Sequence, residues 1–301
     1  MEINKMKLSC CFIDIDKEYK PDTEAGLKRL INSYSEAGFD GIDFNVGLEA
    51  YRTDTYNADY YKSIKSYAAD KGISFFQTHT PYPTAFSDEE KTKLRFFENV
   101  KCLEHSALLG AEFVVIHPCG HLDYAKDNNR EYMLEYNYKY YKGLIPYAEA
   151  YGVKIAIENV GNYRGHAVTE TAEGILELLG MLDNDAFVAC YDSGHSNCLT
   201  DDPIGMLSKL GNNIGCTHIH DNDCKIDLHL LPYYGKIDWE KMMETLAKTG
   251  YSGNLNFEAR SFVTCLPIEL RTDGLKHMVK VGRHLIDRFN YYKVKQNEQK
   301  F

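Results

Sequence analysis

The sequence is organised around eight short runs that are rich in β-branched and aromatic residues, with longer segments of helical periodicity between them. Such runs are typical of β-strands, and their regular recurrence is typical of a repeated strand–helix unit. They span residues 7–14, 41–45, 73–79, 112–117, 153–159, 186–192, 213–220 and 253–259.

The intervening segments have the periodicity and the end signals of helices. Residues 22–38 place Leu27, Leu30, Ile31 and Tyr34 on one stripe, and residues 88–111 form a second such segment. Glycine closes several segments just before the next run, which predicts a left-handed stop at the helix end. These glycines are Gly38, Gly72, Gly110, Gly152 and Gly250.

Eight units in 301 residues give about 38 residues each, which favours an α/β fold with a single (β/α)8 TIM barrel over a doubly wound sheet. No linker interrupts the chain, so we expect one domain over residues 1–301, with a loose polar tail at 293–301. Neither GxGxxG nor GxxxxGK follows the first run, so we expect no nucleotide cofactor.

Composition narrows the classes of partner. The chain is 44% hydrophobic and 26% charged, its first residues lack the apolar stretch typical of a signal peptide, and no apolar run reaches membrane-spanning length. Its cysteines are scattered without a CxxC pair, which indicates reduced thiols in a cytoplasmic protein. The formal net charge of −10 disfavours a nucleic-acid partner. We therefore expect neither nucleic acid nor membrane as a partner.

Six consecutive runs end on a residue that can titrate or bind a metal. For a single residue such as Asp192, a helix cap is the alternative explanation. In a barrel, however, the carboxyl ends of the strands converge on one mouth, where carboxylates would repel one another. A divalent cation would remove that repulsion, so the set predicts a metal site. Its members are His79, His117, Glu158, Asp192, His218 and Glu258.

Several motifs resemble those of the xylose-isomerase-like barrel superfamily, which contains sugar isomerases and epimerases, inosose dehydratases and endonuclease-IV-type DNA repair enzymes. The resemblance covers roughly residues 7–290. The motifs are "THTPYP" (78–83), "VVIHP" (114–118), "IAIENV" (155–160), "CYDSGHSN" (190–197), "THIHDND" (217–223), "DLHLLPYYGKIDW" (227–239) and "NFEA" (256–259).

The chain is similar in motif to the ketose 3-epimerases, and this resemblance implies a ligand set. In those enzymes, one divalent ion is held by the residues that match Glu158, Asp192, His218 and Glu258, and the residue that matches His195 contacts substrate. Such a mixed oxygen and nitrogen set suits Mn²⁺, Mg²⁺, Co²⁺ or Zn²⁺ without selecting one of them.

This arrangement suits proton transfer on a small carbohydrate. A cation that chelates a hydroxyketone acidifies the C–H bond between the two oxygens. Glu158 and Glu258 are then the candidates to remove and return the proton, with the ion and His195 stabilising the enediolate. We therefore predict a metal-dependent isomerase or epimerase of a sugar or sugar phosphate. The same site would also serve an inosose or keto-acid dehydratase, or a barrel that binds metal and sugar without turnover.

An endonuclease-IV-like multi-zinc phosphodiesterase is the rival prediction. "SGHSNCLTDD" and "NVGLEAYRTD" lack the residues associated with that enzyme, and in sugar-acting relatives Asp227 and His229 would instead order their loop. Its metal ligands nevertheless all have counterparts here, which extends the candidate metal or substrate residues. The counterparts are His79, His117, Glu158, Asp192, His195, His218, Asp227, His229 and Glu258.

Three further expectations concern groups around the site. Arg164 and Arg260 lie where a barrel mouth would meet a phosphate or carboxylate of the substrate. His220 either supports His218 from behind or faces the opposite side of its strand. By resemblance, we also expect a homodimer or homotetramer.

Overall fold

The computed structural model describes residues 6–15, 20, 23–120, 122–161, 168–200 and 202–298. Within these residues, eight strands form one parallel sheet in the order β7-β6-β5-β4-β3-β2-β1-β8. The strands are β1 (Leu8–Cys10), β2 (Gly41–Asn45), β3 (Ser74–His79), β4 (Phe113–Ile116), β5 (Lys154–Glu158), β6 (Phe187–Asp192), β7 (Ile214–His218) and β8 (Leu255–Phe257).

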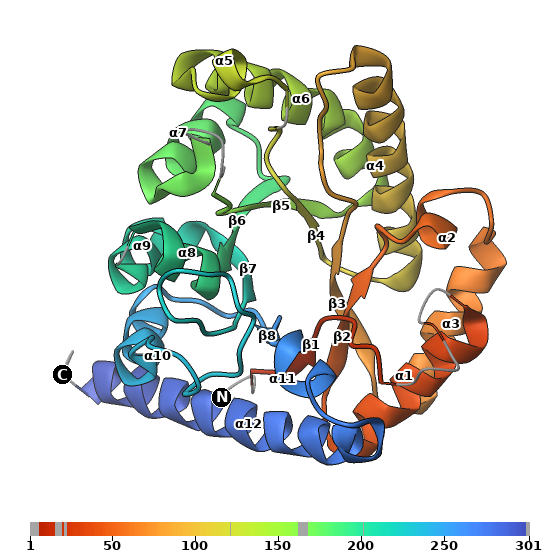
Figure 1. The fold of residues 1–301 in the computed structure, drawn as a ribbon, viewed down its shortest axis with the longest axis vertical. Coiled ribbons are helices and arrows are strands. Elements are labelled where there is room, and N and C mark those ends of the chain that lie inside the picture. Colours follow the sequence, from red (N-terminus) through yellow and green to blue (C-terminus); the bar gives the residue numbers. More distant parts are fainter. Residues whose placement is uncertain are drawn as a thin grey trace.

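The two edges of this sheet meet just beyond the end of β7. Ile219 forms a parallel bridge with Phe257 of β8. The Ile219 amide donates to the Asn256 carbonyl at 2.8 Å, and the Glu258 amide donates to the Ile219 carbonyl at 3.1 Å. The sheet is therefore nearly closed, and Figure 1 looks along the resulting barrel, with the strands inside and the helices outside. The predicted single (β/α)8 TIM barrel is confirmed.

Helices follow the strands and form the outer ring. They are α1 (Glu24–Ala37), α2 (Glu49–Arg52), α3 (Ala58–Asp70), α4 (Glu89–Leu109), α5 (Tyr124–Asp127), α6 (Arg130–Tyr151), η1 (Val168–Glu170), α7 (Ala172–Leu182), α8 (Ser193–Thr200), α9 (Pro203–Leu210), η2 (Gly211–Asn213), α10 (Trp239–Lys248), α11 (Arg260–Thr264) and α12 (Ile268–Glu298). None of these helices is both long enough and apolar enough to cross a membrane.

The predicted end signals set the helix boundaries. Asp88 caps α4 by accepting hydrogen bonds from the amides of Glu90 and Lys91. The five predicted closing glycines all have positive φ, between 67° and 100°, a region that residues with a Cβ rarely adopt. Short turns then lead directly into the next strand, as the sequence indicates.

The structure differs from the expected boundaries in two respects that matter. His117 and Glu258 lie one residue beyond β4 and β8 rather than at their ends. The tail from residue 293, expected to be loose, continues α12 through Glu298. Residues 299–301 lie outside the described residues.

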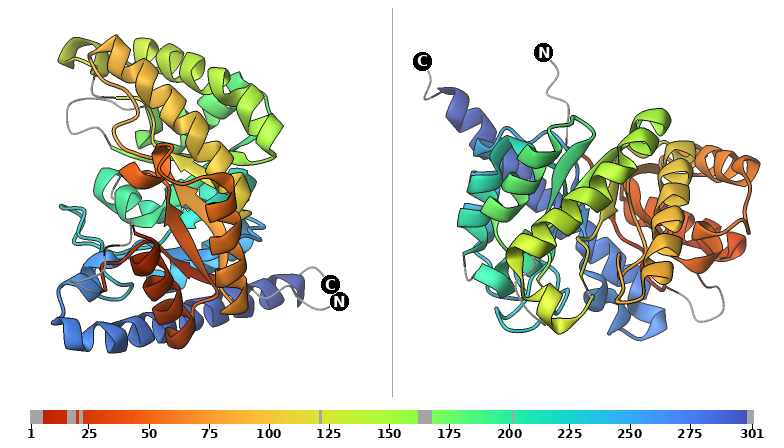
Figure 2. Two further views of the ribbon diagram at one scale, coloured as in Figure 1. Left: turned by 90° about the vertical axis from the view of Figure 1, so that its right-hand side faces the viewer. Right: turned by 90° about the horizontal axis from the view of Figure 1, so that it is seen from above.

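The long helix α12 packs across the outside of the barrel, on the side opposite α4 and α6 (Figure 2). Its buried residue Leu285 belongs to the largest hydrophobic cluster, together with Leu8 of β1 and Phe257 of β8. The exposed residue Leu270 lies near the start of the same helix. Helix α12 therefore covers the strands at which the barrel begins and ends.

We predict that Leu285→Ala lowers the free energy of unfolding by about 2–5 kcal/mol, because it removes buried methyl groups and leaves a cavity. The matched control is Leu270→Ala, the same change at a side chain that is 49% exposed in the same helix, which we expect to cost less than about 0.5 kcal/mol. Urea denaturation of both variants measures the difference. Equal losses would show that α12 does not contribute to the core as described.

Candidate metal centre

A cavity of about 380 Å³ opens at the carboxyl ends of the strands. Glu158, Asp192 and His218 lie behind its walls with no exposed surface, and they contact the lining residues. Seven of the predicted site residues line the cavity itself, together with residues that were not predicted. The lining consists of Cys11, Phe12, Asp43, Asn45, His79, Tyr82, His117, His195, Asp227, His229, Glu258 and Arg260.

The four predicted metal ligands come together. Each of Glu158, Asp192, His218 and Glu258 offers one donor atom, and these atoms all lie within 4.8 Å of one another. His218 Nδ1 lies 3.0 Å from Glu158 Oε1, 3.0 Å from Glu258 Oε2 and 3.8 Å from Asp192 Oδ2. Three carboxylates thus surround one ring nitrogen.

Strand register explains this convergence. Asp192 of β6 is paired directly with His218 of β7, and Glu158 of β5 is paired with Cys190, two residues before Asp192. Residues in register on neighbouring parallel strands point to the same side of the sheet, so these side chains share the barrel interior. Asn159 fixes the strand ends further, because its Oδ1 accepts from the Asp192 amide at 2.6 Å.

Asp192 also caps helix α8, which is the role that the sequence offered as an alternative to metal binding. Its Oδ1 accepts a hydrogen bond from the His195 amide at 2.6 Å, in the first turn of α8. Its Oδ2 lies 3.0 Å from His220 Nε2 and 3.8 Å from His218 Nδ1. The two roles are compatible, because each uses a different oxygen.

The donor set fits a divalent cation. Glu158 Oε2 and Glu258 Oε2 are buried and accept no well-oriented hydrogen bond from the described residues. This holds even though His117 Nε2 lies 2.9 Å from Glu158 Oε2 and His218 Nδ1 lies 3.0 Å from Glu258 Oε2. Buried carboxylate oxygens without a directed donor are costly, and a cation at their common centre would satisfy them.

His79 and His117 approach Glu158 from its other side. The Nε2 atoms of the two histidines are 3.1 Å apart, and His79 Nε2 lies 3.5 Å from Glu158 Oε2. The other ring nitrogen of His79, Nδ1, lies 2.8 Å from the Thr80 carbonyl, to which it can only donate. This hydrogen bond fixes the orientation of the ring and leaves Nε2 directed at the site.

His195, Asp227 and His229 form a second group at the mouth. Asp227 Oδ2 lies 3.4 Å from His195 Nε2 and 2.9 Å from His229 Nε2. In both rings Nδ1 faces a backbone carbonyl, that of Asn159 at 3.1 Å for His195 and that of Glu258 at 2.9 Å for His229. All three side chains therefore belong to the cavity.

Asp221 orders the connection between β7 and α10, and the expectation that Asp227 also orders this loop stays a prediction. Asp221 is fully buried, and its Oδ2 accepts from Trp239 Nε1 at 2.7 Å. Its Oδ1 accepts from the amides of Lys236 and Ile237 at 3.0 and 3.2 Å. A single carboxylate thus joins the start and the end of the β7–α10 connection, which leaves Asp227 free to face the cavity.

One functional candidate escaped the sequence analysis, and a second was given a different place. Asp43 in β2 is buried, and its Oδ2 lies 3.1 Å from His218 Nε2. His220, for which the sequence left open either support of His218 or a place on the opposite side of the strand, contacts Asp192, with Nε2 2.9 Å from Asp192 Oδ1. A charged residue inside the apolar run 41–45 was the available signal for Asp43.

The two predicted arginines have different outcomes. Arg260, at the start of α11, is exposed and lines the cavity. Arg164 lies outside the described residues.

Charge pairing in the site shifts several pKa values strongly. Burial alone would raise the pKa of Glu158, but the neighbouring His117 and His218 outweigh burial and hold it well below its usual range. Burial would likewise raise the pKa of Glu258, but His218 and His229 outweigh burial and hold it well below its usual range. Burial would lower the pKa of His79, but Glu158 raises it to about 9. Without an ion, the protonated form of His79 is therefore favoured beside the Glu158 carboxylate.

We predict that the metal-free protein loses stability as the pH rises from about 6.5 to 9. The pKa of His79 is raised in the folded state, from 6.5 to about 9, so its stabilising contribution is complete below 6.5 and disappears as the pH rises through 9. Thermal melting in a chelator, with His79→Gln as the control, measures this loss, and the variant should show a shallower pH dependence. Parallel profiles for the two proteins would contradict the assignment.

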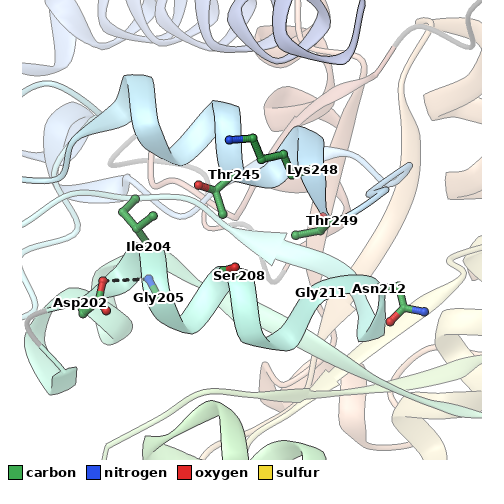
Figure 3. Close-up of a pocket in the computed structure, with 9 residues that line it drawn as sticks. All are labelled: Asp202, Ile204, Gly205, Ser208, Gly211, Asn212, Thr245, Lys248 and Thr249. Atoms are coloured by element: carbon green, nitrogen blue, oxygen red, sulfur yellow. Dashed lines mark hydrogen bonds between the residues drawn. The ribbon is translucent and has the colours of Figure 1, made fainter. Parts of the chain in front are cut away.

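A larger groove lies elsewhere and carries no comparable chemistry. It measures about 660 Å³ and lies between α9 and α10 on the outside of the barrel (Figure 3). Asp202, one of its lining residues, accepts from the Gly205 amide at 2.8 Å and so serves as a helix cap. The groove contains no group of metal-ligating side chains among the described residues, so the mouth remains the candidate site.

The fold and the site place the chain among (β/α)8-barrel proteins that carry their functional groups at the carboxyl ends of the strands. The sequence profile of one such family matches residues 31–281. The chain belongs to this family, the xylose isomerase-like TIM barrel proteins.

Three proteins are similar to this chain in sequence. An uncharacterised protein of Methanocaldococcus jannaschii is 32% identical over 162 residues, which cover 53% of this chain and 54%, about half, of that protein. An uncharacterised protein of Sinorhizobium fredii is 31% identical over 78% of this chain and 81% of its own length. The D-psicose 3-epimerase of Ruminiclostridium cellulolyticum is 22% identical, with 80% of each chain covered.

Solved structures share the fold. A D-tagatose 3-epimerase-like protein superposes with a TM-score of 0.76 at 22% identity, covering 95% of this chain and 99% of that one. The IolI protein, solved with a bound zinc atom, superposes with a TM-score of 0.72 at 20% identity and the same coverage. At these identities the likeness concerns the fold alone.

Proposed function

We propose that this protein is a divalent-metal-dependent isomerase or epimerase of a small sugar or sugar phosphate. The observation that carries the proposal is the convergence of Glu158, Asp192 and Glu258 on His218 Nδ1, at the wall of a cavity large enough for a small molecule. Its volume of about 380 Å³ falls in the range of roughly 300–1,000 Å³ typical of such sites. The family, and the epimerase among the relatives, support the same class.

The residues that would hold the ion are Glu158, Asp192, His218 and Glu258. When bound, a divalent ion supplies Lewis acidity, which makes the C–H bond between the carbonyl and hydroxyl groups of a ketose more acidic. Mn²⁺, Mg²⁺, Co²⁺ and Zn²⁺ all suit these ligands.

Glu158 and Glu258 are the proposed proton-transfer residues. They approach His218 from β5 and from just beyond β8, so a substrate at the centre lies within reach of two carboxylates from separate strands. Their lowered pKa values keep both groups ionised, which is the protonation state that a general base requires. His195 lines the cavity, and its Nε2, which lies 3.4 Å from Asp227 Oδ2, is placed to donate to a developing enediolate oxygen.

Arg260 and the second group at the mouth are the proposed substrate contacts. The exposed Arg260 guanidinium suits a phosphate or carboxylate at the open end of the cavity. The Nε2 atoms of His195 and His229 lie beside Asp227, where they could contact hydroxyl groups. Assembly as a homodimer or homotetramer and a cytoplasmic location stay predictions.

We predict that Glu158→Gln and Glu258→Gln each lower turnover by about 10²–10⁴-fold, the usual contribution of a general acid or base. The measurement is deuterium incorporation from solvent during turnover, screened over ketoses, inososes and keto-sugar acids. Glu112→Gln, a change at an exposed carboxylate on the outside of the barrel, is the control. A Glu158 or Glu258 variant that turns over at the parental rate would lose its proposed role. Water elimination in this screen would instead identify a dehydratase.

We predict one tightly held ion per chain and its loss in Asp192→Ala. The thermal midpoint should also fall, because bound metal at 100 times its Kd stabilises the native state by about 2.7 kcal/mol. Asp227→Ala, which changes a mouth carboxylate outside the four-ligand set, should retain the ion and raise KM. Elemental analysis and thermal melting of the three proteins measure these effects. Full metal content in Asp192→Ala would contradict the ligand assignment.

The multi-zinc phosphodiesterase is the second candidate, because all of its counterpart residues lie at the mouth. Several zinc ions per chain, together with cleavage of a duplex that carries an abasic site, would establish it in place of the sugar enzyme.

A further inference from the structure

The interior of the barrel below the metal centre contains a layer of buried polar side chains. Ser9, Asp43, Gln77 and Asn256 come from β1, β2, β3 and β8, and none is more than 2% exposed. Barrel interiors are usually filled by branched apolar residues, so such a layer needs a specific reason. The opposite half of this barrel follows the usual rule, with a small apolar cluster that includes Val115, Ala156, Cys190 and Cys216.

The hydrogen bonds of this layer converge on one atom. Ser9 Oγ donates to Asn256 Oδ1 at 2.7 Å. Asn256 Nδ2 and Gln77 Nε2 each donate to Asp43 Oδ2 at 3.0 Å. The same oxygen lies 3.1 Å from His218 Nε2. Three donors from three other strands therefore hold the Asp43 carboxylate directly beneath the histidine.

We propose that Asp43 is a positioning residue for His218, an inference that rests on the proposed metal site. A neutral imidazole has one N–H donor and one lone pair. With an ion among the three carboxylates that face Nδ1, the ring is neutral, and because Nε2 faces the Asp43 carboxylate, which can only accept, the proton stays on Nε2 and the lone pair on Nδ1. Nδ1 is the atom that faces Glu158, Asp192 and Glu258, so Asp43 directs the lone pair to the ion.

Two other roles for Asp43 lead to different results. The layer could act only to stabilise the barrel, because buried and satisfied networks are rigid. Asp43 also lines the cavity, and its Oδ1 has no hydrogen-bond partner among the described residues, so it could contact substrate instead. Metal affinity, stability and KM separate the three roles.

The test is isothermal titration of Mn²⁺ into metal-free protein. We expect Asp43→Asn, which keeps the shape of the side chain, to weaken binding by about 10–100-fold. Ser9→Ala is the matched control, because it removes a hydrogen bond of the same layer without touching Asp43 or His218, and it should lower stability alone. If Asp43→Asn does not fold, Asn256→Leu removes one donor to Asp43 and should give a smaller loss of affinity.

A double-mutant cycle shows whether Asp43 acts through His218. In a His218→Gln background, we expect Asp43→Asn to have no further effect on affinity, whereas an independent structural role would give the same loss in both backgrounds and overturn the proposal. If the His218→Gln protein binds Mn²⁺ too weakly for its affinity to be measured, the visible spectrum of the Co²⁺-loaded Asp43→Asn protein replaces the double-mutant cycle. An unchanged spectrum there would count against repositioning of the ligand.

The remaining outcomes are distinct from one another. Unchanged Mn²⁺ affinity in Asp43→Asn with a raised KM would assign Asp43 to substrate and overturn this inference alone. A parent protein that binds no divalent ion would overturn the proposed metal site, and this inference with it.

Discussion

The burial of carboxylates at the barrel mouth is the constraint on which the rest of the site depends. Glu158 and Asp192 have no exposed surface, and taking an ionised carboxylate out of water costs several kcal/mol unless it is paired. Histidine rings pack around both groups, and although burial would lower the pKa values of His195 and His218, the neighbouring carboxylates raise them well above their usual range. Such an arrangement is hard to explain by stability alone and is well suited to holding a cation.

The connection after β7 is organised separately from the metal centre. Asp221 fixes both ends of this connection through backbone amides and the Trp239 indole, while Asp227 and His229 reach the cavity from its middle. His229 has a positive φ of 48°, a conformation that is strained for a residue with a Cβ. In this conformation its Nδ1 forms a hydrogen bond to the Glu258 carbonyl. One carboxylate therefore orders the loop, and another faces the substrate space.

The fold and the convergence of the candidate ligands at the barrel mouth were predictable because their signals are local in sequence. Eight apolar runs at regular spacing predict the barrel, and a titratable residue at a strand end predicts its place at the mouth. Glu158, Asp192 and His218 follow directly from this rule. The closing glycines were equally predictable, because a left-handed helix end depends on the backbone of one residue.

Asp43, His220 and Asp221 were not assigned their roles, because those roles depend on which strands become neighbours in space. Asp43 and His218 are 175 residues apart in sequence, and only closure of the barrel brings them together. His220 follows β7 by two residues, and nothing in the sequence distinguishes Asp192 from His218 as its partner. The role of Asp221 was not assigned for a similar reason, since a buried carboxylate and a cavity carboxylate look alike in sequence.

The central claim is that Glu158, Asp192, His218 and Glu258 bind one divalent ion. Anomalous diffraction from crystals grown with Mn²⁺ or Zn²⁺, recorded at the absorption edge of the metal, tests it most directly. The account predicts one strong peak at the centre of these four side chains, roughly 2.0–2.3 Å from a donor atom of each. No peak at that position, or a peak only between His79 and His117, would contradict it.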